Sequence, residues 1–242
     1  MEALKPLLRD SSKLEEFIAE HSNLPGPRAN LELAFAFADI FEDFEVLLKW
    51  TGIDADQAGI DNPKSFLPFC AAVCLGNLYA KNKNKEVLQL LKKLSNDPRW
   101  RIREAAVFGF QRIGENDLKD LQKIFLEWIK TSNNLEKRAI LVSLAHPKLL
   151  EKKNSIFCFD ILDGILKELN LDADFPILKK GLDFVLSVYV AANPEYGFNF
   201  IKAWAGKDRR IDSIIKSNLK KNRLVKIFPD KTSKFLDQLS VE

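Results

Sequence analysis

The stretch that decides the fold reads Leu90-Leu91-Lys92-Lys93-Leu94-Ser95-Asn96-Asp97-Pro98-Arg99-Trp100-Arg101-Ile102-Arg103-Glu104-Ala105-Ala106. Its leucines close one amphipathic helix. Asp97 then caps a second helix whose first position is Pro98, where a missing N–H costs nothing because that group has no partner inside a helix. Ala105 and Ala106 give the second helix a small inner face. The stretch therefore predicts two antiparallel helices that approach each other closely.

The same register recurs along the chain. Candidate cap residues stand at intervals of 36, 35, 42 and 34 residues, at Asp61, Asp97, Ser132, Asp174 and Asp208. Such periods, with two helices each, are typical of stacked helical repeats, and the longer step places an insertion near Lys148 to Ser155. No strand-like alternation lasts beyond a few residues. We expect an all-α superhelix of five or six antiparallel helix pairs, without a sheet, as a single domain over residues 1–242.

Two parts of the sequence resemble known families. The stretch from Leu90 to Ala106 resembles the HEAT-repeat signature, in which an Asp is followed six positions later by a basic residue, as Asp97 is by Arg103. Four later segments resemble the late repeats of the AlkC/AlkD-type DNA alkylation repair proteins: Leu178–Leu182, Asn193–Glu195, Ala203–Trp204 and Ile214–Lys221. This resemblance implies a HEAT-like α-solenoid with a basic concave groove, and it implies glycosylase activity on alkylated bases. The family's catalytic aromatic and acidic residues lie in middle repeats, where no matching motif aligns.

The N-terminal third predicts two further helices. The first begins at a cap Ser11 or Ser12, with Glu15 as the partner in a capping box, and runs to about His21. The second is a core helix from Ala29 to Trp50, which carries a broad apolar face.

Composition fits a soluble cytoplasmic protein. Of the 242 residues, 46% are apolar and 29% are charged. Three cysteines are an odd and sparse set, which favours a reducing compartment over a secreted disulfide scaffold. The acidic N-terminus does not resemble an export signal, and the longest uncharged stretch, Ser65 to Ala80, is too short to span a bilayer. We expect no membrane association.

Most cofactor chemistry lacks a motif in this sequence. The two histidines, His21 and His146, lie far from the cysteines, and Cys70 and Cys74 stand in an apolar helix, so we expect buried thiols and no metal. The ten glycines never occur as Gly-x-Gly, which argues against a nucleotide loop. No nucleophile elbow is present either. We therefore predict no cofactor, no bound nucleotide and no catalytic residue.

Charge is distributed unevenly. Residues 1–65 hold 6 Lys and Arg against 13 Asp and Glu, whereas residues 201–242 hold 11 against 5. A basic end of this size is a candidate footprint for a polyanion, and a solvated lysine-rich surface is the alternative.

Two basic clusters are candidate nucleic-acid-binding residues. The first is Arg99, Trp100 and Arg101, because guanidinium groups bind phosphate and an indole stacks on a base. Trp100 covering a neighbouring repeat is the alternative for that residue. The second cluster is Arg209, Lys216 and Lys220, which fall near one helix face by three- and four-residue steps. A basic outer cap on the last repeat is the alternative there.

We therefore expect a non-catalytic α-solenoid whose basic concave face binds a macromolecule, with DNA or RNA favoured over a protein partner. Two alternatives stay open. One is the DNA glycosylase that the resemblance implies. The other is a protein–protein interaction scaffold, which the acidic N-terminal third favours.

Overall fold

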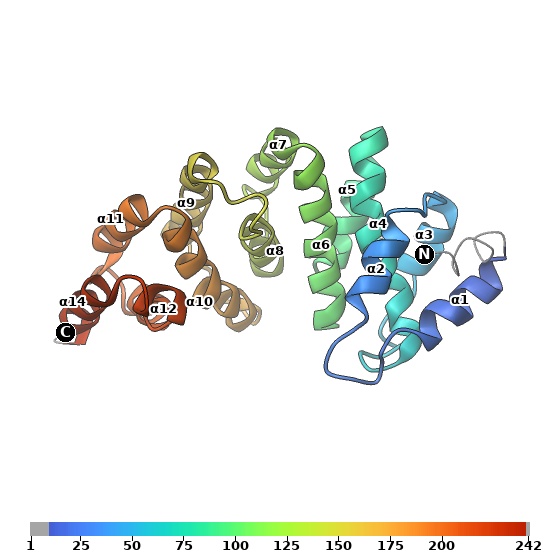
Figure 1. Cartoon of the computed structure of the whole chain (residues 1–242), viewed down its shortest axis with the longest axis horizontal. Coiled ribbons are helices and arrows are strands. Elements are labelled where there is room, and N and C mark those ends of the chain that lie inside the picture. The colour runs from blue at the N-terminus through green and yellow to red at the C-terminus, as the bar shows by residue number, and fades with distance from the viewer. Residues whose placement is uncertain (1–9, 241–242) are drawn as a thin grey trace. The chain divides into compact units, whose positions relative to one another are not determined.

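The computed structural model describes residues 10–240, and all regular structure within that range is helical (Figure 1). The prediction of an all-α protein is confirmed. The described residues up to Lys123 form one compact unit, and those from Ile124 onward form a second. The single domain expected over residues 1–242 stays a prediction.

The first unit contains one short 3-10 turn, Pro63–Ser65, and six complete helices among the described residues. The helices are α1 (Ser11–Glu20), α2 (Leu31–Ala38), α3 (Phe44–Thr51), α4 (Phe66–Asn82), α5 (Lys85–Leu94) and α6 (Trp100–Asn116). Helix α7 (Leu118–Trp128) begins in this unit and ends in the second.

Helix α4 is the centre of the first unit. Its first ten residues are all buried, because α2, α3, α5 and α6 pack around it. Helices α4 and α6 approach most closely at Gly76 and Gly109, where a Cβ added to Gly76 would lie 2.8 Å from the Cα of Gly109. The inner face predicted for α6 is confirmed, since Ala105 and Ala106 are fully buried.

The second unit is centred on α10. Its helices are α8 (Asn134–Leu144), α9 (Lys152–Lys167), α10 (Phe175–Ala192), α11 (Pro194–Trp204), α12 (Arg209–Leu219), α13 (Asn222–Val225) and α14 (Pro229–Ser240). Helices α8 and α12 both pack against α10, while α9 and α11 contact each other. The buried Asn218 of α12 accepts a hydrogen bond from the N–H of Ser187 (2.8 Å) and donates one to the carbonyl of Leu182 (2.9 Å). These bonds fix α12 on α10.

Helices begin within a few residues of all five predicted positions. Helices α4, α6, α8, α10 and α12 start at Phe66, Trp100, Asn134, Phe175 and Arg209. Asp208 caps α12 as predicted, since its carboxylate accepts a hydrogen bond from the N–H of Arg210 (2.8 Å). The longer step falls on residues 145–151, between α8 and α9.

Three of the predicted caps are wrong. Next to Asp61, it is Asn62 that caps the 3-10 turn before α4, because its side chain accepts a hydrogen bond from the N–H of Lys64 (2.9 Å). Helix α6 begins at Trp100 rather than Pro98, because the Asp97 carboxylate accepts hydrogen bonds from the N–H and the guanidinium of Arg99 instead of capping the helix. Helix α8 is capped by Asn133 rather than Ser132. At Asp61 and Ser132 the cap is the Asn that follows the predicted residue.

The N-terminal predictions also need correction. Asp10 caps α1, and Glu15 accepts hydrogen bonds from Lys49 and from the indole of Trp50 instead of completing a capping box. The single helix expected from Ala29 to Trp50 is divided into α2 and α3, because Asp43 caps a new helix after a short turn.

Candidate nucleic-acid interface

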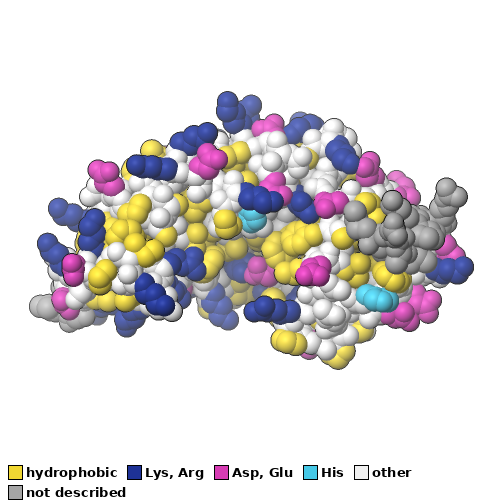
Figure 2. All heavy atoms as spheres, viewed as in Figure 1, with side chains coloured by type: hydrophobic (Ala, Val, Ile, Leu, Met, Phe, Trp, Pro, Cys, Tyr) yellow, Lys and Arg dark blue, Asp and Glu magenta, His cyan; other side chains and the backbone are white. Residues whose placement is uncertain are grey.

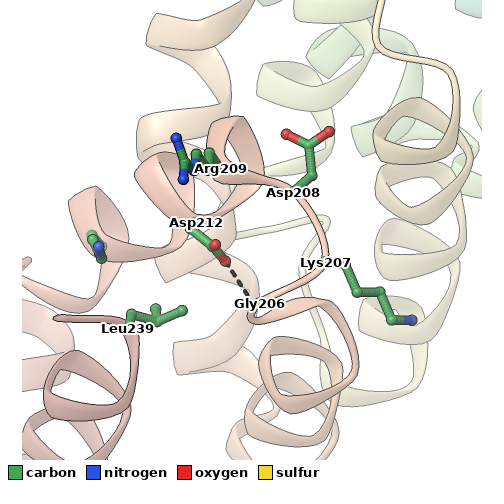
Figure 3. A pocket seen from close by; sticks show the side chains of 7 residues that line it. Gly206, Lys207, Asp208, Arg209, Asp212 and Leu239 are labelled. Atoms are coloured by element: carbon green, nitrogen blue, oxygen red, sulfur yellow. Dashed lines mark hydrogen bonds between the residues drawn. The ribbon is translucent and has the colours of Figure 1, made fainter. Parts of the chain in front are cut away.

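The turn between α11 and α12 forms one side of an open hollow, which we call the α12 hollow (Figure 3). Its volume is about 500 Å³. The turn, the first two turns of α12 and one residue of α14 line it. The lining residues are Gly206, Lys207, Asp208, Arg209, Asp212, Lys216 and Leu239. The candidates Arg209 and Lys216 thus share one site, seven residues apart on α12.

Short-range hydrogen bonds set the shape of this turn. Gly206 has a φ of 78°, a conformation that residues with a side chain rarely adopt. Its N–H donates to the carboxylate of Asp212 (2.9 Å), as the dashed line in Figure 3 marks. Asp208 caps α12 and pairs with Arg210, and the hydrogen bond from that guanidinium lowers the pKa of Asp208 to about 2. Both carboxylates of the hollow therefore accept hydrogen bonds from groups of the chain.

The cations of the hollow have fewer partners. Arg209 is exposed, Lys216 is half-buried, and neither has a hydrogen bond or ion pair with any residue between 10 and 240. Lys207 lies over the ring of Trp204, with its Nζ 5.3 Å from the ring centre. Unpaired cations around an open hollow are suited to bind phosphate oxygens.

The surface next to this hollow is also basic. Lys220 ends α12 outside the hollow and is exposed without an intramolecular partner in the described chain. From position 207 to position 226 the chain holds eight Lys and Arg against two Asp. Figure 2 shows several Lys and Arg side chains at the left of the view, over the C-terminal helices. The basic character predicted for this end is therefore a property of the surface.

Arg99, by contrast, is only 4% exposed. Its guanidinium donates hydrogen bonds to the carbonyl oxygens of Ile53 (2.8 Å), Asp54 (3.0 Å) and Ala58 (2.9 Å), and to the carboxylate of Asp97 (2.7 Å). A guanidinium that is buried against carbonyl oxygens is not accessible to phosphate. The role predicted for Arg99 is at odds with this burial, and its contacts hold the loop after α3 against the start of α6.

Arg101 is also buried, whereas the side chain of Trp100 lies at the surface. Arg101 is 6% exposed and donates to the carbonyl oxygens of Gly26 (2.5 Å) and Pro27 (3.3 Å). The side chain of Trp100 is 48% exposed, and the guanidinium of Arg101 lies 4.5 Å from its ring centre. The phosphate contact predicted for Arg101 is therefore also at odds with the structure, while the ring of Trp100 is open to a ligand.

Trp204 and Asp163 form an aromatic and acidic pair that the sequence did not predict. The indole Nε1 of Trp204 on α11 donates to Asp163 on α9 (3.0 Å), and Lys167 pairs with the same carboxylate (2.5 Å). Burial and the negative charge of Asp163 raise the pKa of Asp160, one turn earlier. The two partners are 41 residues apart, so no local spacing could have identified them. Because Lys207 covers the Trp204 ring, this pair is closed to a cationic ligand.

Metal and thiol chemistry have little support in the described part of the chain. Between residues 10 and 240 no three His, Cys, Asp or Glu side chains are placed to hold a metal ion. Cys70 and Cys74 are buried as predicted, and Cys158 is buried as well. Burial raises the pKa of each thiol, that of Cys158 to about 12. No helix in the same range is long and apolar enough to cross a membrane.

Comparison of the sequence with known family models, with curated proteins and with solved structures gave no match.

Proposed function

We propose that this protein is a non-catalytic, HEAT-like α-solenoid that binds nucleic acid through the basic surface of its second unit. The α12 hollow carries the proposal, because Arg209 and Lys216 meet there without a partner inside the described chain. Phosphate contacts by Lys and Arg provide most of the sequence-independent affinity for nucleic acid.

The repeat pattern supports the solenoid part of the proposal. Helices α4, α6, α8, α10 and α12 start at intervals of 34, 34, 41 and 34 residues. In the first unit α2, α4 and α6 pack side by side, and in the second α8, α10 and α12 do the same. A regular period combined with contacts between every second helix is the organisation of stacked helical hairpins.

The hollow favours phosphate over a reacting substrate. One oxygen of Asp212 accepts a hydrogen bond from the N–H of Gly206, and Arg210 holds the carboxylate of Asp208 and makes it a weaker base by lowering its pKa. We therefore propose binding without catalysis at this site, and a backbone phosphate as the group that Arg209 and Lys216 contact.

The test is a titration of fluorescently labelled single-stranded and duplex DNA at about 50 and 200 mM salt. The variant carries Arg209→Ala, Lys216→Ala and Lys220→Ala. The matched control carries Lys64→Ala, Lys85→Ala and Lys119→Ala, which removes the same charge from exposed lysines of the first unit that have no ion pair in the described chain.

We expect the first variant to bind more weakly. The slope of log K against log salt should become shallower by about 2 to 3, because binding with fewer phosphate contacts releases fewer counterions from the DNA. The control should retain the affinity of the wild type apart from a small effect of net charge. If wild-type protein binds neither DNA at about 50 mM salt, or if both variants lose affinity equally, the proposal is wrong.

A further inference from the structure

A second hollow lies in the first unit beneath the exposed ring of Trp100, and we call it the Trp100 hollow. Its volume is about 310 Å³. Phe69 of α4 and Phe108 of α6 line it, together with Leu31 of α2 and the segment Pro27 to Ala29 before that helix. Phe69 and Phe108 meet edge to face, with ring centres 6.1 Å apart. The walls are therefore mostly apolar and are held by aromatic packing.

Arg101 organises both sides of this hollow. Its guanidinium lies against the Trp100 ring, and its hydrogen bonds to the carbonyl oxygens of Gly26 and Pro27 hold the segment that carries Arg28. The indole and this segment are thus fixed before a ligand arrives. Preorganised groups bind more tightly because little conformational entropy is lost on association.

Arg28 supplies the free charge of the hollow. It is exposed and has no hydrogen bond or ion pair with any described residue, whereas Arg101 is engaged by carbonyl oxygens and by Asp61 at 3.5 Å. Glu104 also lines the hollow and already has an interaction within the chain. The charge that remains for a ligand is positive, so a ligand that complements it carries an anionic group.

The apolar walls argue against a nucleobase as the occupant. A base has several hydrogen-bonding groups on its edges, and burying them without partners costs about 1–3 kcal/mol each. An apolar amino-acid side chain has no such groups to satisfy. Trp and Arg are also the residue types that most often dominate the affinity of protein interfaces, and here both stand exposed at one hollow.

We propose that the Trp100 hollow is a docking site for a peptide segment of a partner protein, which inserts one large apolar side chain beside Trp100 and places an acidic residue against Arg28. This site is independent of the nucleic-acid surface of the second unit. It gives the chain a protein partner recognised by an apolar and acidic pair of residues.

A random peptide library displayed on phage tests the proposal when it is selected on the immobilised full-length chain. Enriched peptides should carry Leu, Ile, Met, Phe or Trp within four positions of Asp or Glu. Synthetic copies should bind the Trp100→Ala and Arg28→Gln variants at least about tenfold more weakly than the wild type. The Lys202→Gln variant, which removes an exposed positive charge of the second unit, should bind them normally.

Because the side chains of Trp100 and Arg28 are exposed, thermal melts should show that both variants remain folded. If Trp100→Ala does not fold, the Arg28→Gln variant alone tests the proposal. Three outcomes would overturn the proposal: no peptide is enriched, the enriched peptides lack the pair, or both variants bind them with wild-type affinity. Displacement of the peptides by adenosine monophosphate would instead show that the hollow accepts a nucleotide, and would equally overturn it.

Discussion

At the scale of single residues, Arg99 joins two parts of the first unit that lie far apart in the sequence. Its guanidinium contacts carbonyl oxygens 41 to 46 residues earlier in the chain. Those carbonyls belong to the loop after α3. A planar guanidinium satisfies several of them at once, which a lysine ammonium does not.

Replacing Arg99 should therefore destabilise the fold strongly. We expect Arg99→Ala to lower the free energy of unfolding by about 3 kcal/mol or more, because Asp97 and three carbonyl oxygens lose their hydrogen bonds from the guanidinium, and Arg99→Lys should not restore it. Urea unfolding followed by circular dichroism measures the effect. Arg209→Ala, at an exposed and unpaired position, should stay within about 0.5 kcal/mol of the wild type. Equal unfolding midpoints for the two alanine variants would contradict this role for Arg99.

Asp208 gives a prediction for pH dependence. Its pKa is lowered to about 2 by the hydrogen bond from Arg210, against an ordinary value near 3.8, so the folded state binds the proton less readily than the unfolded state. The charged pair thus contributes stability above pH about 4, and the contribution disappears as the pH falls toward 2.

Asp208→Asn isolates this contribution, because Asn also caps helices but carries no charge. The melting temperature of the variant should be lower than that of the wild type at pH 7, and the gap should close between pH about 4 and about 2. A gap that is constant across this range would show that the pair with Arg210 does not stabilise the fold.

At the scale of helices, the crossing of α4 and α6 depends on two glycines. A Cβ on Gly109 would lie 2.5 Å from the carbonyl oxygen of Ala72, and one on Gly76 would meet the backbone of Gly109. Backbone atoms cannot move aside as a flexible side chain can. The two helices would have to separate, which would open the core that α4 forms.

Gly76→Ala should therefore destabilise the protein although alanine favours helices. The gain in helix propensity is about 1 kcal/mol, whereas overpacking costs about 1–3 kcal/mol and here pushes on backbone. Gly164→Ala is the matched control, since Gly164 lies within α9 and an added Cβ would meet nothing within 4 Å. Thermal melts should move in opposite directions for the two variants. Stabilisation by Gly76→Ala would show that the helices are not in close contact there.

At the scale of the whole molecule, the two units differ in charge. Residues 124–242 hold 20 Lys and Arg against 15 Asp and Glu, whereas residues 1–123 hold 17 against 19. A polyanion should therefore be attracted to the second unit and repelled weakly by the first. This division agrees with the proposal that the two units have different ligands.

We further expect that the protein does not excise alkylated bases even if it binds DNA. Excision needs either a pocket for a flipped base or, where the lesion is a cation, a cleft whose aromatic and acidic groups stabilise positive charge. The Trp204–Asp163 pair is closed, since Lys207 covers the indole and Lys167 occupies the carboxylate. Excess protein should release 3- and 7-methylpurines from methylated DNA only at the spontaneous rate, as chromatography of the free bases measures. Faster release that Asp163→Asn abolishes would establish a glycosylase.

The sequence by itself determined the helical class and, to within a few residues, where five of the helices begin. Helix formation depends on hydrogen bonds between residues four apart and on caps within the next turn, so Asp97 and Asp208 mark helix starts to within a few residues. The sequence also identified Arg209 and Lys216 as one stripe, because their spacing of seven is a local property of a helix.

The tertiary structure alone decided which of the basic residues remain available. Arg99 and Arg101 are buried because they hydrogen-bond to loop residues that lie 40 to 75 positions away in the sequence. No local sequence pattern encodes those contacts. The same holds for the Trp100 hollow, whose walls come from α2, α4, α6 and the segment before α2. The sequence shows which residues carry a charge or an aromatic ring, but their burial in the fold decides whether they contact the chain itself or a ligand.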